Sequence, residues 1–302
     1  MFGSMLKRLI VITGPTAVGK TDISIQVAQT YGSPVISCDS RQIFKEMNIG
    51  TAVPDASQLA AVKHYFIQSV PVTESYSAGQ YEIDALELID RLFAEGHDTL
   101  VMSGGSGFYV DAVCNGLDNL PVAPPELREE LTRRVREEGV AALAEELKKL
   151  DPLSWAAIDR SNGQRVVRAL ETILVSGRPF VEFKLDAPKK RDFSIDKICL
   201  TRPREEIYSR IDRRVLAMVD AGLVDEVRSL RPYRNCPALQ TVGYKEIFEY
   251  LDGKIPLEEA IRLIQRNTRH YAKKQLTWWK RDPSVRWLDI STTDSSTQVR
   301  LI

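Results

Sequence analysis

The sequence has no long hydrophobic run. Its longest apolar stretches, such as RLIVITG at residues 8–14, are far shorter than the roughly 20 residues that a membrane-spanning helix needs. No signal-peptide pattern precedes them, so we expect a cytoplasmic protein with no membrane partner. With 43% apolar and 27% charged residues in 302, the composition is that of a globular protein with one large domain or two smaller ones.

Cysteine is scarce and scattered along the chain. The four cysteines lie far apart and form no C-x-x-C pair, which argues against a zinc knuckle and against a disulfide framework. We therefore expect four reduced thiols, at Cys38, Cys114, Cys199 and Cys236.

The chain also lacks an excess of either charge. It contains 41 basic and 41 acidic residues, which by itself gives no support to a nucleic-acid partner. However, residues 260–281, AIRLIQRNTRHYAKKQLTWWKR, contain no Asp or Glu. Arg262, Arg266, Arg269 and Lys273 recur there at the spacing of one helix face. This stripe is either a solvated face or a contact for a polyanion, and we favour the second because solvated faces usually mix both signs.

Strand and helix patterns alternate in the first third of the chain. Apolar runs at 8–13, 33–37 and 98–105 predict strands, while 20–32 and 77–96 have the periodicity of helices. This alternation predicts a parallel sheet with right-handed crossovers and ligands at the carboxyl ends of its strands. The expected fold class is an α/β, P-loop NTPase-like core with helices on both faces of the sheet and an all-helical insertion domain.

The pattern changes after a proline-containing linker at 115–125. Residues 126–177 read as amphipathic helices without a strand, and a strand at 196–201 returns the chain to the sheet before further helices reach about Arg281. We expect three parts: residues 1–115 as the first part of the core, 116–190 as the insertion, and 191–302 as the return to the core with C-terminal basic helices.

GPTAVGKT at residues 14–21 matches the phosphate-binding loop pattern G-x-x-x-x-G-K-[ST]. A strand before it and a helix after it are the expected context, which favours this interpretation over a simple glycine turn. Backbone N–H groups would cradle a diphosphate or triphosphate, Lys20 would reach its outer phosphates, and the Thr21 hydroxyl would ligate Mg²⁺. The expected anion-binding residues are Gly14, Pro15, Thr16, Ala17, Val18, Gly19, Lys20 and Thr21.

One carboxylate follows a strand near this loop. A hydrolase normally adds an acidic residue at the end of a further strand, but the strand at 98–105 ends in VMSGGSGFY, without a carboxylate. Asp39, in ISCDSRQIF, follows the second strand instead. It could hold Mg²⁺, accept a proton, or simply cap a helix.

Seven motifs carry a resemblance to a known family. GPTAVGKT, ISCDSRQIF, NIGTAVP, MSGGSGFY, NGQRVVRALE, QTVGYKE and RNTRHYAKKQLTWWKR resemble, in order and spacing, the motifs of the tRNA dimethylallyltransferases, also called tRNA isopentenyltransferases. The resemblance implies transfer of the dimethylallyl group from dimethylallyl diphosphate to N6 of the adenosine 3′-adjacent to the anticodon, with release of diphosphate and Mg²⁺ as cofactor. It implies the tRNA anticodon stem-loop as partner, and we expect a monomer. The sequence near Ile302 has no Cys or His pair, so we expect the bacterial type.

This chemistry suits the residues. An exocyclic adenine amine is a poor nucleophile, so a base that accepts its proton should help, and we expect Asp39 in that role. Negative charge that develops on the departing diphosphate would be stabilised by the loop, Lys20, Mg²⁺ and arginines. The expected catalytic residues are Asp39, Ser106 and Lys20.

The resemblance also implies the remaining site residues. The target base must leave its stack and be held by its edge, for which the amide of Gln42 is suited. We expect one of Arg210 and Arg214 to approach the diphosphate, and we favour Arg214. Ser106 and Phe108 replace the family's usual threonine and leucine, and Val53 replaces a frequent lysine, so we do not count Val53 as a phosphate contact. The expected tRNA contacts are Asp39, Ser40, Arg41, Gln42, Ser106, Arg128, Gln164, Arg165, Val166, Val167, Arg168, Arg269 and Lys273, while Tyr271, Trp278 and Trp279 are expected in the core.

Three other functions stay open. An adenylate isopentenyltransferase would act on free AMP, ADP or ATP, without needing the insertion or the basic helix. A P-loop small-molecule kinase would use Asp39 to activate a hydroxyl and would consume ATP. A non-catalytic RNA-binding protein is disfavoured, because a phosphate-binding loop together with a carboxylate is more than binding needs.

Overall fold

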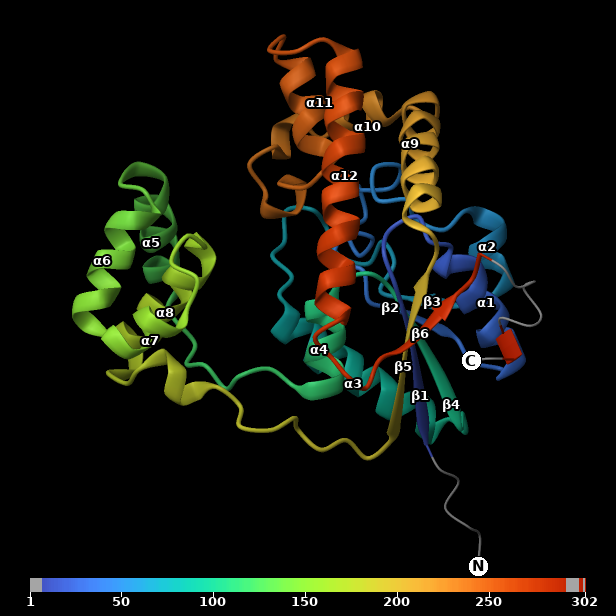
Figure 1. Cartoon of the computed structure of the whole chain (residues 1–302), viewed down its shortest axis with the longest axis horizontal. Helices are drawn as coiled ribbons and strands as arrows, with labels where there is room; N and C mark the ends of the chain where they lie inside the picture. The colour runs from blue at the N-terminus through green and yellow to red at the C-terminus, as the bar shows by residue number, and fades with distance from the viewer. Residues whose placement is uncertain (1–6, 292–298, 301) are drawn as a thin grey trace, which may run out of the picture. The chain divides into compact units, whose positions relative to one another are not determined.

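The computed structural model describes residues 7–291, 299–300 and 302 (Figure 1). It divides into two compact units. Unit 1 comprises Met1–Cys114 and Lys190–Ile302, and unit 2 comprises Asn115–Lys189. The insertion expected from the sequence at 116–190 differs from unit 2 by one residue at each end. Each unit is described by itself below.

Unit 1 contains a parallel sheet, which confirms the predicted fold class. Among the described residues the strand order is β3-β2-β4-β1-β5-β6, with Ile10 of β1 opposite Val101 of β4 on one side and Asp196 of β5 on the other. Two short strands at the edges, β3 and β6, were not predicted. The strands are β1 (Arg8–Thr13), β2 (Val35–Ser37), β3 (His64–Tyr65), β4 (Thr99–Ser103), β5 (Ser194–Thr201) and β6 (Arg286–Asp289).

Helices cover both faces of the sheet and bury the strands on both sides. Leu9 and Val11 of β1 point into a core with α3 and α4, whereas Ile10 and Ile12 point into a core with α1. A central parallel strand must be apolar on both faces, which explains the uninterrupted run in β1. The covering helices are α1 (Lys20–Thr30), α3 (Ala78–Ala94) and α4 (Gly107–Asn115), with the short α2 (Ala56–Ala61) beside α1.

A further group of helices in unit 1 packs around a core of its own. Ile211, Val227, Tyr244 and Ile264, each from a different helix, are buried together there with residues of the segment 43–47. The long helix α12, red-orange in Figure 1, ends with Trp279 in the core against the sheet. The elements are α9 (Arg204–Asp220), α10 (Leu223–Ser229), α11 (Tyr244–Leu251) and α12 (Leu257–Trp279), with 3₁₀ turns η2 (Arg231–Tyr233) and η3 (Pro237–Leu239).

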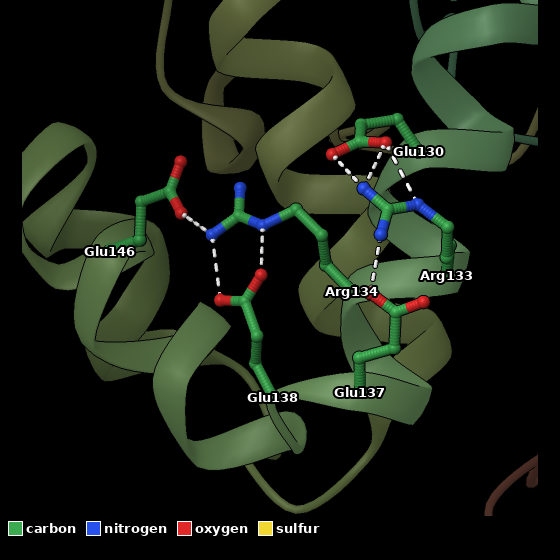
Figure 2. A network of polar contacts seen from close by, with 6 residues as sticks. All are labelled: Glu130, Arg133, Arg134, Glu137, Glu138 and Glu146. Atoms are coloured by element: carbon green, nitrogen blue, oxygen red, sulfur yellow. Dashed lines mark hydrogen bonds and ion pairs between the residues drawn. The ribbon is translucent and has the colours of Figure 1, made fainter.

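Unit 2 is helical, with a small core of leucines and valines between its helices. Arg134 of α5 hydrogen-bonds Glu138 one turn later and Glu146 of α6, and Arg133 pairs with Glu130 and Glu137 (Figure 2). The two ends of the unit meet, because the N–H of Lys189 donates to the carbonyl oxygen of Asn115 at 2.8 Å. Its elements are α5 (Pro125–Glu137), α6 (Val140–Leu150), α7 (Pro152–Ala157), α8 (Gly163–Ser176) and η1 (Phe180–Phe183).

Candidate active site

The carboxyl ends of neighbouring strands bring together segments that lie far apart in the sequence. Because β2, β4, β1 and β5 are parallel and adjacent in that order, the loops after them open at one edge of the sheet. These loops carry the GPTAVGKT motif, Asp39, Ser106 and Arg202. A cavity of about 640 Å³ opens at this edge, and its lining includes Thr16, Lys20, Thr21, Asp39, Gln42, Arg210 and Arg214.

The phosphate-binding loop needs glycine at two positions. Gly14 has a φ of 144°, and a Cβ there would lie 2.6 Å from the carbonyl oxygen of Leu200. Gly19 has a φ of 111° and immediately precedes α1. The free N–H groups and the positive dipole end of α1 therefore face the loop, which suits a bound anion. Pro15 has no N–H to donate, so its contribution is to the shape of the loop.

Lys20 is held by the loop itself. Its Nζ donates to the carbonyl oxygens of Gly14 at 3.0 Å and Pro15 at 2.9 Å. Burial lowers the pKa of Lys20 to about 8, and Arg214 acts in the same direction while Asp39 opposes it. An anion bound in the loop would favour the charged ammonium and raise this pKa again.

Three arginines support the outer side of the loop. Arg202 donates to the carbonyl oxygen of Val18 at 2.9 Å, Arg210 donates to that of Ala17 at 2.6 Å, and Arg214 donates to the Thr16 hydroxyl. Burial lowers the pKa of Arg214, and Arg210 adds to the effect, whereas Asp39 opposes it. The Nε of Arg214 is buried and has no hydrogen-bond partner among the described residues. An unpaired buried donor is costly, so Arg214 is the better placed of the two predicted arginines to receive an anion.

Asp39 has one engaged and one open carboxylate oxygen. Its Oδ1 accepts from the backbone N–H of Arg41 at 2.8 Å and of Gln42 at 3.2 Å. These bonds make Asp39 the cap of a turn and not of a helix, because the next helix, α2, begins only at Ala56. The helix cap that the sequence left open as an alternative is therefore wrong. Its Oδ2 receives no hydrogen bond from any residue in the described ranges, and the side chain lines the cavity. The cap therefore leaves one oxygen for chemistry.

Ser40 and Ser106 connect the loops after β2 and β4. The Ser106 Oγ accepts from the Ser40 N–H at 2.9 Å and lies 3.0 Å from the Ser40 Oγ. The structure thus brings both predicted residues directly beside Asp39.

Tyr271 of α12 was expected in the core, and this prediction is wrong because 41% of the residue is exposed. Its hydroxyl lies beside Ser106, whose hydrogen bond partly offsets the rise in the pKa of Tyr271 that burial and Asp39 cause. Trp279 is buried, as predicted, and Trp278 is partly buried.

Gln42 is committed to its own chain in this structure. Its Nε2 donates to the carbonyl oxygens of Thr51 at 3.2 Å and Ala52 at 2.8 Å. Both amide hydrogens are used, so Oε1 remains for a ligand. The expectation that this amide reads both a donor and an acceptor of adenine therefore does not fit this arrangement.

Gln275 was missed by the sequence reasoning. This buried residue of α12 accepts from the Thr16 N–H at 2.8 Å and donates to the carbonyl oxygen of Gly105 at 2.9 Å. It therefore ties the phosphate-binding loop to the loop that carries Ser106. Its position within the KKQ part of the last motif was the available signal.

The basic stripe of α12 is partly neutralised. Arg262 pairs with Glu259 through two hydrogen bonds, and Arg269 pairs with Asp212 of α9. Arg266 and Lys273 are exposed and form no ion pair within the described part of the chain. Lys273 is thus freer than Arg269 to meet an external phosphate.

The predicted contacts in unit 2 fall into two groups. Arg128 and Arg168 both bind the carboxylate of Glu171, at 2.7 and 2.8 Å, and the Glu171 side chain is 1% exposed. Burial alone would raise the pKa of Glu171, but the hydrogen bonds from the two arginines outweigh it, so this pKa is lowered.

The rest of the predicted segment lies at the start of α8. Gln164 and Arg165 are exposed there, next to the cap Asn162. Val166 and Val167 are buried in the core of unit 2, which corrects the expectation that their side chains contact RNA. The two valines directly follow the two exposed residues, because a helix turns its successive side chains to different faces.

The site offers few protein ligands for a cation. Within residues 7–291, 299–300 and 302, no three His, Cys, Asp or Glu side chains cluster in a way that could hold a metal ion. Thr21 and Asp39 both line the cavity, and a hydroxyl and a carboxylate are the oxygen donors that Mg²⁺ prefers when phosphate and water complete its shell. Across the described part of the chain, no helix has the length and apolar character to cross a membrane.

Known proteins share this sequence and fold. Residues 42–282 match the family model described as IPP transferase. The tRNA dimethylallyltransferase 2 of Porphyromonas gingivalis is 50% identical over 279 residues, which cover 92% of this chain and 93% of that protein. The tRNA dimethylallyltransferase of Cytophaga hutchinsonii is 47% identical over 281 residues, covering 93% and 92%.

Solved structures of tRNA-modifying transferases have a similar fold. The tRNA isopentenylpyrophosphate transferase of Bacillus halodurans superimposes with a TM-score of 0.72 and 38% identity, covering 98% of this chain and 94% of that one. A eukaryotic dimethylallyltransferase acting on tRNA gives a TM-score of 0.80 and 25% identity, covering 98% and 78%. These findings confirm the resemblance seen in the seven motifs: the chain belongs to the IPP transferase family.

Proposed function

We propose that this chain transfers the dimethylallyl group from dimethylallyl diphosphate to N6 of the adenosine 3′-adjacent to the anticodon in tRNA, and releases diphosphate. One observation carries the proposal: a single cavity joins the anion-binding groups Lys20 and Arg214 to the open carboxylate oxygen of Asp39. The names of the relatives, tRNA dimethylallyltransferases, support it.

The phosphate-binding loop would hold the leaving group. As the bond between the allylic carbon and the diphosphate oxygen breaks, negative charge grows on that oxygen. The start of α1, Lys20 and the unpaired Nε of Arg214 place positive charge and donors at this end of the cavity. Such preorganised donors stabilise developing charge without reorganisation.

Asp39 would take the proton. The amine lone pair is delocalised into the adenine ring, so the N–H bond must weaken as the new C–N bond forms. The Oδ2 of Asp39 accepts this proton, while Oδ1 keeps the turn in place through the N–H groups of Arg41 and Gln42. Ser40 and Ser106 lie beside it and would help to hold the extruded base.

Proximity of the carboxylate to the diphosphate is then a requirement of the reaction. The proton acceptor must lie near the carbon that leaves the diphosphate, and Lys20 and Arg214 offset the repulsion between the two anions. Thr21 would hold a Mg²⁺ ion together with diphosphate oxygens, and this ion would supply further positive charge to the leaving group.

The exposed basic and polar residues would bind the acceptor. Gln164 and Arg165 of unit 2 and Lys273 of α12 are accessible, whereas Arg133 and Arg134 are neutralised by glutamates (Figure 2). We propose the first three as contacts to the anticodon stem-loop, with phosphate contacts that weaken as salt rises.

Mass spectrometry of tRNA nucleosides after incubation with dimethylallyl diphosphate and Mg²⁺ tests the proposal. We expect a dimethylallyl adduct on one adenosine of the anticodon loop. Labelling of AMP but not of tRNA would indicate an adenylate isopentenyltransferase, and ATP consumption without loss of the dimethylallyl donor would indicate a kinase. Either result would overturn the proposal.

A further inference from the structure

The motifs NIGTAVP and QTVGYKE meet at one carboxylate that the chemistry above does not use. Glu226 of α10 accepts three backbone N–H groups, from Asn48 at 3.1 Å, Ile49 at 2.6 Å and Gly50 at 3.0 Å. The hydroxyl of Tyr244, from the second motif, donates to the same carboxylate at 2.7 Å. Four donors therefore converge on one side chain, and the loop that supplies three of them lies 176–178 residues before Glu226 in the sequence.

The loop that Glu226 holds forms a wall of the candidate active site. Thr51, Ala52, Val53 and Pro54 line the cavity together with Lys20 and Asp39. Gly50 lies against the Tyr244 ring so closely that a Cβ there would be 2.6 Å from it. Ala52 has a φ of 53°, a conformation that a residue with a side chain keeps only when its surroundings enforce it.

The same wall orients Gln42. The carbonyl oxygens of Thr51 and Ala52 accept both hydrogens of the Gln42 amide, and the Gln42 N–H donates to Asp39 Oδ1. A continuous set of hydrogen bonds thus runs from Glu226 through the loop to Gln42 and Asp39. A shift of the loop would move the amide that faces the acceptor.

We propose that Glu226 and Tyr244 are positioning residues for the acceptor adenosine: by fixing the loop 48–54 they set where Gln42 lies beside Asp39. The proposal rests on the proposed function. It implies that their loss impairs use of tRNA while the diphosphate end of the cavity, built from other loops, is unaffected.

Glu226→Gln is the test. An amide presents an NH₂ group where the carboxylate had an acceptor oxygen, so it loses either the Asn48 and Ile49 bonds or the Gly50 bond. The Tyr244 hydroxyl can turn and accept from the amide. We expect the KM for tRNA to rise roughly tenfold, as for the loss of a charge-assisted hydrogen bond, with the KM for dimethylallyl diphosphate unchanged. Tyr244→Phe, which removes one bond and keeps the ring, should show the same split to a smaller extent.

Asp225→Asn is the matched control. Asp225 precedes Glu226 on α10 and pairs with the exposed Arg228, so its substitution removes the same charge from the same helix without touching the loop. It should leave both KM values and kcat unchanged. The concentration of sites that bind dimethylallyl diphosphate, titrated in each variant, measures the folded fraction.

A double substitution tests the route. If Glu226 acts through Gln42, then Glu226→Gln in a Gln42→Ala background should add little to the KM for tRNA. Additive effects, a fall in kcat with both KM values unchanged, or behaviour like Asp225→Asn would each overturn the inference. If Glu226→Gln does not fold, Tyr244→Phe carries the same comparison. Failure of the unsubstituted chain to modify tRNA would instead overturn the proposed function.

Discussion

Replacing Asp39 by asparagine separates the two roles that its carboxylate can have. The Oδ1 of asparagine can still accept the N–H groups of Arg41 and Gln42, at 2.8 and 3.2 Å in the native chain, so the turn should persist. The amide cannot accept the proton of N6. A general base contributes about 10²- to 10⁴-fold, which is roughly 3–5 kcal/mol of barrier at 1.36 kcal/mol per tenfold change in rate. We expect kcat to fall by that factor while tRNA binding is retained.

Single-turnover transfer of labelled dimethylallyl to tRNA, alongside tRNA binding, is the measurement. Asp39→Ala adds the loss of the two hydrogen bonds that hold the turn, about 1 kcal/mol of stability each, and the comparison of the two variants isolates the chemistry. The assays belong at neutral pH or below, because removing the Asp39 charge lowers the pKa of Lys20 further below about 8.

Two results would contradict this reasoning. An asparagine variant that turns over nearly as fast as the native chain would reduce Asp39 to a cap. A loss of turnover that added Mg²⁺ restores would show that Asp39 holds the metal and is not the base.

Three further predictions concern charge. In the free site the pKa of Lys20 is about 8, and a bound diphosphate raises it. The Kd of inorganic diphosphate should therefore rise as pH passes above about 8, and Lys20→Met should abolish this pH dependence. Lys273→Ala should reduce the magnitude of the slope of log affinity for tRNA against log salt concentration by about 0.7–0.9. Arg262→Ala should change this slope less, because Arg262 is already paired with Glu259. Equal changes in the two variants would contradict the assignment. Glu171→Gln should reduce the free energy of unfolding by about 1–3 kcal/mol in urea titrations. Because the pKa of Glu171 is lowered from 4.5 by the two arginines, this difference should be complete above about pH 4.5 and be lost as pH falls through the lowered pKa of the folded state.

Much of the fold could be predicted because its signals are local. The apolar runs of β1, β2, β4 and β5 and the glycines around Lys20 are each visible within a few residues. The strands β3 and β6 have two and four residues, too few for a periodicity, and they exist because an edge of the sheet is available to pair with. Tyr271 was misplaced because the periodicity of its helix does not show that its hydroxyl lies beside Ser106 while 41% of the residue stays exposed.

The candidate site could be predicted only where chemistry follows a motif. Lys20 begins α1, and Asp39 and Ser106 lie just past the ends of β2 and β4. Parallel strands bring such positions together. Gln275 bonds Thr16 across 259 residues, and Glu226 bonds Gly50 across 176. The last motif marks Gln275 but not its partner, and nothing local pairs Glu226 with Gly50, because a polar side chain within an amphipathic helix is expected to be solvated until its partner is known.

The junction of Asn115 and Lys189 makes the helical unit exchangeable in principle. The Lys189 N–H donates to the Asn115 carbonyl oxygen. A β-turn is closed by a bond of the same kind, from the N–H of its fourth residue to the carbonyl oxygen of its first, so that only two residues lie between the bonded pair. Two residues could therefore replace everything between them without altering the strand order of the core. Removal or exchange of the helical unit should therefore leave the sheet of unit 1, and the cavity at its edge, in place.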